Sequence, residues 1–173
     1  MPFDNERVAR AVLAYLQTEL GDALEDVATA WAGTDPLTLP EPVTWHYGHK
    51  PEVIALPSTS FPFVAVIPTN RNPLRRKYAW GFQDQAITVY VDWFVVAADE
   101  TTADKLCSRY AEAVLAVLQQ QRAFGGYDQV DYEPRVDLSE ASRHPVTVDA
   151  DMFESDQVDF IKLGRITLIF GGQ

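Results

Sequence analysis

The stretch Ala86 to Ala97, "AITVYVDWFVVA", carries the strongest β-strand signal in the chain, and it leads directly into a long amphipathic segment. Side chains alternate between the two faces of a strand. A first face would carry Ile87, Val89, Val91, Trp93 and Val95, and a second face would carry Thr88, Tyr90, Asp92, Phe94 and Val96. The first face therefore belongs to the core, whereas the second is mixed enough to be partly covered by another element or another chain.

A long amphipathic helix is expected next, over "TADKLCSRYAEAVLAVLQQQ" (102–121), with capping residues in Asp99 to Thr102. Apolar positions recur at steps of three or four: Ala103, Leu106, Cys107, Tyr110, Val114, Val117 and Leu118. The opposite side carries Asp104, Lys105, Ser108, Arg109 and Glu112. We expect this helix to lie on the sheet as its main packing partner, because each buried leucine or valine contributes about 1.5–3 kcal/mol.

The N-terminal segment also has the apolar periodicity of a helix. Val8, Val12, Leu16 and Leu20 lie four apart, which predicts a helix from about Asn5 to Glu19 behind Asp4 as N-cap. Gly21 is expected to break this helix. Asp22 and Glu25 have the spacing of a capping box, which predicts a short second helix through Trp31, closed by Gly33.

Three further strands are expected, at "FPFVAVIP" (61–68), "YDQVDYEPRVDL" (127–138) and "VDFIKLGRITLIF" (158–170). The last is expected to bend or bulge near Gly164, because its apolar phase changes there. Gly125 and Gly126 are interpreted as the stop of the long helix. The proline-rich segment 35–60 and the acidic segment 137–157 are expected to be extended or loop insertions.

These elements predict the α+β class: one domain over residues 1–173, in which an antiparallel or mixed sheet of about four to five strands packs with an N-terminal helix and one long amphipathic helix. The apolar content of 47% is that of a folded globular protein. No segment has the length of a membrane span or the pattern of an export signal, so synthesis in the cytoplasm and no membrane partner are expected.

The charge of the chain argues against general DNA binding. The formal net charge is -11 and the sequence pI is about 4.6. Affinity for a phosphate backbone comes mainly from lysine and arginine, so an acidic protein is repelled by DNA at neutral pH.

Side chains that could carry chemistry do not form a recognisable motif. His46 and His49 lie three apart in "WHYGHK", but Gly48 and the nearby prolines disfavour the helix that would make them a metal pair. His144 lies near serines without a nucleophile-elbow pattern, and Cys107 falls on the apolar stripe of its helix. The acidic run 149–159 lacks the glycine and glutamate of a calcium loop. We therefore expect no enzymatic activity, no metal and no cofactor.

One segment stands out against the acidic background. "PTNRNPLRRKYAWGF" (68–82) gathers Arg71, Arg75, Arg76 and Lys77, and the aromatic residues Tyr78 and Trp80 follow. Three interpretations remain open: a hairpin loop kept soluble by charge, a phosphate or DNA contact, or an arm that docks on an acidic neighbour. Aromatic side chains are common anchors of interfaces, and opposite charges steer association. We call residues 71–80 the basic arm.

The order of elements resembles the tail terminator and tail-completion proteins of long-tailed bacteriophages. The similar features are the opening helix "ERVARAVLAYLQTEL", the long strand that feeds directly into a helix ending in a leucine and valine run, and the C-terminal strand "FIKLGRITLIF". The resemblance implies a structural virion protein that forms a ring, usually of six subunits, on the end of the tail tube. Its partners would be further copies of itself, the major tail tube protein and a neck or head-completion protein.

In such rings the sheets line the channel and the helices face outward, so DNA would pass through without specific binding. An acidic channel wall fits this role, because DNA must not adhere to it. Two alternatives stay open at this point. The first is a neck or head-closure protein of the same particle, and the second is a small cytoplasmic enzyme or ligand-binding domain that uses the loop around His46 and His49.

Overall fold

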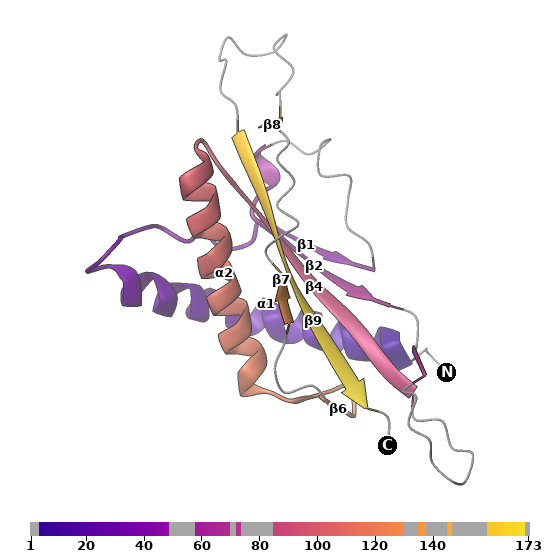
Figure 1. The fold of residues 1–173 in the computed structure, drawn as a ribbon. Helices are drawn as coiled ribbons and strands as arrows, with labels where there is room; N and C mark the ends of the chain where they lie inside the picture. Colours follow the sequence, from indigo (N-terminus) through magenta and orange to yellow (C-terminus); the bar gives the residue numbers. More distant parts are fainter. Residues whose placement is uncertain are drawn as a thin grey trace, which may run out of the picture.

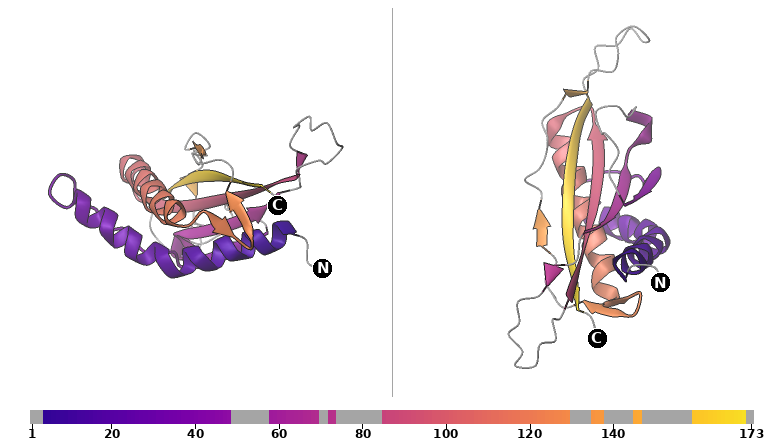
Figure 2. Two further views of the ribbon diagram at one scale, coloured as in Figure 1. Left: turned by 90° about the horizontal axis from the view of Figure 1, so that it is seen from below. Right: turned by 90° about the vertical axis from the view of Figure 1, so that its right-hand side faces the viewer.

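The computed structural model describes residues 4–48, 58–69, 72–73, 85–129, 135–137, 145–146 and 159–171. Two helices, α1 (Asp4–Trp31) and α2 (Glu100–Gln120), pack against the same face of a β-sheet, as Figures 1 and 2 show. In the described part of the chain, neither helix is long and apolar enough to cross a membrane. The α+β class expected from the sequence is confirmed.

The described residues form one mixed sheet of nine strands. Its main path runs β1-β2-β4-β9-β6-β5, with β3 paired to β4, and β7 and β8 paired to β9. β1 runs parallel to β2, and the other described pairings are antiparallel. The strands are β1 (Thr44–Tyr47), β2 (Phe63–Pro68), β3 (Asn72–Pro73), β4 (Gln85–Ala97), β5 (Ala123–Phe124), β6 (Tyr127–Gln129), β7 (Arg135–Asp137), β8 (Pro145–Val146) and β9 (Asp159–Gly171). The sheet thus has more strands than the four to five predicted.

The pairing of β4 with β9 forms the centre of the sheet. Their register is continuous from Ala86↔Gly171 to Ala97↔Phe160. The predicted first face of β4 is confirmed as core, because each of its five apolar side chains is at most 2% exposed. This face packs on α1 and α2, so both helices share their core contacts with β4.

The N-terminal region is one helix, so the predicted break at Gly21 is wrong. A glycine inside a helix costs about 1 kcal/mol relative to alanine. The apolar stripe continues past Gly21 to Leu24, which is 1% exposed, and burying such a side chain contributes about 1.5–3 kcal/mol. Tertiary packing therefore outweighs the local signal, and the carboxyl group of Glu41 packs over the glycine.

The predicted bulge at Gly164 is also wrong, because β9 keeps its register through this residue. The apolar residues change face along the strand for another reason: Ile161 and Leu163 face away from the helices, whereas Ile166, Leu168 and Phe170 face toward them. Gly164 lies at the crossover, directly opposite Trp93. A Cβ atom at this position would lie 2.0 Å from Cζ2 of Trp93, so the glycine makes room for the indole ring.

Two other expectations need correction. The glycine pair does not stop the long helix, which already ends at Gln120. Gly125 and Gly126 instead form the turn between β5 and β6, with φ angles of 61° and 87° that glycine adopts without strain. The expected proline-rich loop contains β1 and the 3₁₀ turn η2 (Ser58–Ser60), and the strand expected from Tyr127 is divided into β6 and β7.

We predict that Gly164→Ala lowers stability by about 1–3 kcal/mol or more, because the added methyl group overlaps the buried indole of Trp93. Urea unfolding followed by tryptophan fluorescence measures this difference. Gly33→Ala is the matched control, since a Cβ there meets nothing within 4 Å, and its stability should stay within about 0.5 kcal/mol of wild type. Equal stability of the two variants would contradict the assigned contact.

Candidate functional site

The basic arm is carried by a hairpin. Its residues Arg71, Arg75, Arg76, Lys77, Tyr78 and Trp80 lie outside the described residues. The two strands that flank it are described, and they pair antiparallel from Phe63↔Phe94 to Pro68↔Val89. β3 extends this ladder by pairing Asn72 with Ala86. The prediction that the segment joins two strands is therefore confirmed, while its role in an interface stays a prediction.

The base of the hairpin is held at the N-terminal end of α1. The backbone N–H and the hydroxyl of Thr69 both donate to the carbonyl oxygen of Thr88, at 3.0 and 2.9 Å. The side-chain amide of Asn5 donates to the carbonyl oxygen of Thr69 at 3.2 Å. The base of the hairpin is thereby fixed relative to one end of the longest helix.

A charged cluster joins the segment after α1 to α2. Arg109 donates to the carboxylate of Asp35 at 2.8 Å and to its backbone carbonyl at 2.7 Å, and its guanidinium lies 4.9 Å from the ring centroid of Trp31. The indole N–H of Trp31 donates to Glu112 at 3.0 Å. Arg109 was expected on the polar side of the helix, but its side chain is 4% exposed. Its long side chain reaches across the apolar contact to a carboxylate that the sequence pattern did not reveal.

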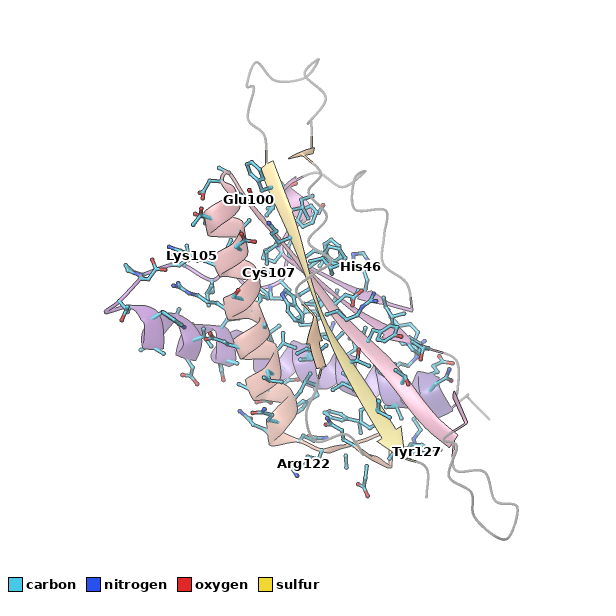
Figure 3. The ribbon with its side chains drawn as sticks, in the orientation of Figure 1. His46, Glu100, Lys105, Cys107, Arg122 and Tyr127 are labelled. Carbon is cyan, nitrogen blue, oxygen red and sulfur yellow. The ribbon has the colours of Figure 1, made fainter. Side chains whose placement is uncertain are left out.

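Lys105 completes this cluster from the exposed side of α2. Its ammonium lies 3.0 Å from Oδ2 of Asp35, the oxygen that Arg109 also contacts, and donates to Oδ1 at 3.2 Å; Figure 3 labels its position on the helix. The hydrogen bond from Lys105 holds the pKa of Asp35 below its ordinary value, with the charge of Arg109 acting in the same direction. Asp35 is therefore the shared acceptor that ties the end of α1 to α2.

A second cluster fixes the start of α2 to β9. Lys162 faces the helices and is 6% exposed, and its ammonium lies 3.1 Å from Glu100 and 2.9 Å from Asp104. Its hydrogen bond to Asp104 raises the pKa of Lys162. This contribution to stability is full below the ordinary lysine pKa and is lost only as the pH rises through the raised value. Asp99 caps the same helix end through the N–H of Thr102, as predicted.

The second face of the sheet contains a buried ion pair. Asp92 is fully buried, and Arg165 on the neighbouring strand donates to both of its oxygens, at 2.7 and 2.8 Å. The guanidinium also lies 4.5 Å from the ring centroid of Tyr90. A bidentate pair of this kind fixes both geometry and register. The sequence signal for this pair is a charged residue inside each of two largely apolar strands, but it does not by itself show that the two strands are neighbours.

Beside this ion pair lies a small apolar cluster on the second face, formed by Phe61, Phe63, Phe94, Ile161 and Leu163. The rings of Phe63 and Phe94 stack with centroids 4.3 Å apart. His46 from β1 packs edge-on against Phe63 at 5.1 Å, as a neighbour of the aromatic cluster. The second face is thus partly buried around this cluster, while its cover by another element or another chain stays a prediction.

The candidate catalytic side chains are not brought together. His49, His144 and residues 149–158 of the acidic run lie outside the described residues. Among the residues that are described, no three histidine, cysteine, aspartate or glutamate side chains are placed to hold a metal ion. Cys107 is buried, and burial raises the pKa of its thiol to about 11, so it packs as an apolar group. The ion pairs of Asp35, Lys162 and Asp92 instead link neighbouring elements of the fold.

Comparisons with known proteins yield a distant structural likeness. No family model matches this sequence, and no curated protein matches it. Among solved structures, the chain is similar to one from the "virion of native gene transfer agent (GTA) particle". That likeness covers 95% of this chain and 94% of the other, with 18% sequence identity and a TM-score of 0.35. At these values it assigns no family to this chain.

We predict that Arg165→Met destabilises the protein by about 2–4 kcal/mol, because it leaves the carboxylate of Asp92 buried without its partner. Chemical denaturation measures the loss. The double variant Asp92→Leu with Arg165→Met should recover much of it, since no unpaired charge remains. Glu6→Gln removes an exposed ion pair and should change stability by less than about 0.5 kcal/mol. A single variant as stable as this control would contradict the buried pair.

We also predict that Asp35→Asn reduces the acid sensitivity of the protein. The pKa of Asp35 is lowered in the folded state, so its stabilising effect is full above the ordinary value of 3.8 and disappears as the pH falls through the lowered pKa. The wild type should therefore lose more stability than the variant between pH 6 and pH 2.5, measured as the shift of the urea midpoint. Identical shifts in the two proteins would rule out this role for Asp35.

Proposed function

We propose that this chain is a non-enzymatic virion assembly protein, a tail terminator subunit that forms a ring on the end of a phage tail tube and presents a surface to the head or neck. The observation that carries the proposal is the order of elements: an opening helix, the hairpin of β2 and β4, α2 directly after β4, and β9 at the centre of the sheet. This is the order on which the resemblance in the sequence rests.

The position of both helices on the same face of the sheet supports such a role. Both long helices cover the same face of the sheet, so among the described elements the helices form a layer on one side of it. In the proposed ring of six copies, the helices face outward and the sheet faces the channel. The net charge of -11 then keeps the passing DNA from adhering to the wall. The protein acts in the virion after assembly in the host cytoplasm.

The basic arm is proposed as the contact between subunits or with the tail tube. Ion pairs within the described residues already engage Arg10, Lys105, Arg109, Lys162 and Arg165. The arm holds four more of the 14 basic side chains, in a loop longer than a tight hairpin needs. Long loops on a rigid scaffold commonly carry binding function, and the flanking strands supply that scaffold.

We predict that Arg75→Glu with Arg76→Glu impairs ring or tail assembly while the isolated chain keeps its circular dichroism spectrum and unfolding midpoint. Like charges across an interface repel, and so the reversal acts on assembly rather than on the fold. Mass photometry of the purified protein, and negative-stain images of tube ends after it is added to tail tubes, measure the result. Arg7→Glu with Arg122→Glu makes the same change of net charge at exposed positions outside the arm and should assemble normally.

The same experiment tests the proposed function itself. Rings at tube ends, in the wild type, support the tail terminator role, and density next to the portal instead would favour the neck or head-closure alternative. A wild-type protein that remains monomeric and never decorates tubes would overturn the proposal. Normal assembly of the arm variant would return the arm to an ordinary solvated loop.

A further inference from the structure

The C-terminal half of α1 borders a groove that the proposed function leaves unassigned. The groove lies between α1 and the segment that follows it, and is lined by Leu24, Glu25 and Ala28 on the helix and by Pro36, Leu37 and Leu39 opposite. Its volume is about 500 Å³, within the range of clefts that hold ligands or side chains. We call this cleft the α1 groove. Its lining is mainly apolar, with small residues on the helix side.

The rim of the α1 groove is acidic. Glu25 lines it, and Glu41 packs beside Gly21, one helical turn before Glu25. Neither carboxylate forms an ion pair with any of the described residues. Residues 11–49 include no lysine or arginine at all, so nothing in this part of the sequence neutralises the rim.

Beside the end of α1, Arg109 and Lys105 of α2 are both paired with Asp35. A helix carries the equivalent of about half a negative charge at its C-terminus, which basic residues usually compensate. α1 has no basic residue in its last turn. This end of the helix extends beyond α2 in both Figures 1 and 2, so it stands at the outside of the fold. The groove therefore offers an apolar floor and an acidic rim to a partner that is basic and aromatic.

We propose that the α1 groove receives the basic arm of a second copy of this chain. The arm has the complementary chemistry: four basic side chains for the rim, and Tyr78 and Trp80 for the apolar floor. This inference rests on the proposed function, because it names the surface that the arm contacts in the ring. It does not depend on which end of the particle the ring occupies.

The distances favour a second copy over the same chain. The base of the arm is tied to Asn5 at the start of α1, whereas the groove begins at Leu24. At 1.5 Å per residue these points are about 28 Å apart along the helix. Residues 74–84 must leave β3 and return to β4, so they reach about 20 Å at most. An arm at one end and a groove at the other instead make a head-to-tail contact, the kind that closes rings.

A charge exchange tests this contact. The groove variant carries Glu25→Arg and Glu41→Arg, and the arm variant carries Arg75→Glu and Arg76→Glu. Each alone should weaken self-association at least about tenfold in sedimentation velocity, because like charges then meet across the interface. An equimolar mixture of the two should restore association, since each arm finds a groove of opposite charge on the other protein. Asp128→Lys, at an exposed position on β6, is the control and should associate as the wild type does.

The outcomes separate the two proposals. If wild-type rings form and the groove variant associates normally, the α1 groove is not the contact, while the proposed function stands. If a single chain with all four changes associates but the mixture does not, the arm binds within its own chain and the inference is wrong. Loss of association without rescue by the mixture would also contradict charge pairing between these surfaces. Absence of wild-type rings, in solution and on tubes, counts against the proposed function.

Discussion

The close approach of Trp93 to Gly164 is the constraint around which the fold is arranged. The indole lies across the backbone of the neighbouring strand, and its N–H donates to the carbonyl oxygen of Cys107 at 3.1 Å. A single side chain thus contacts β9 beneath it and α2 above it. Because the ring is fully buried, it sets the distance between sheet and helix, and the apolar side chains around it pack to that distance.

Ion pairs add directional contacts between the elements that the apolar core holds together. Asp35 and Arg109 hold the end of α1 to α2, and Lys162 holds the start of α2 to β9. Each link has one deeply buried cation and a more exposed carboxylate, so the cost of burial falls mainly on one partner. Hydrophobic burial is not directional, whereas these pairs fix which turn of one helix meets which part of its neighbour. The two long helices thereby form one rigid layer.

The sequence predicts the helices and strands that have a periodic apolar pattern. Its predictions are wrong where the local structure depends on a contact with a residue far away in the chain. The first face of β4 and the stripe of α2 follow from alternation and from the helical repeat. Local propensity predicts a helix break at Gly21 and a bend or bulge at Gly164, because it does not register the burial of Leu24 or the ring of Trp93. Arg109 was placed in solvent because its partner, Asp35, lies 74 residues earlier in the chain. The basic arm was found because charge clustering is visible in the sequence itself.

The internal ion pairs also change how the net charge should be understood. Five basic side chains pair with carboxylates among the described residues, and Glu25 and Glu41 beside the α1 groove are not in these pairs. The largest group of basic residues in the sequence belongs to the segment whose base is tied to the start of α1, at the other end of the helix from the groove. A uniformly acidic protein would repel its own copies, whereas in the proposed contact this separation places opposite charges against each other. Self-assembly by such a contact weakens as salt screens it, with a Debye length near 10 Å at 0.1 M.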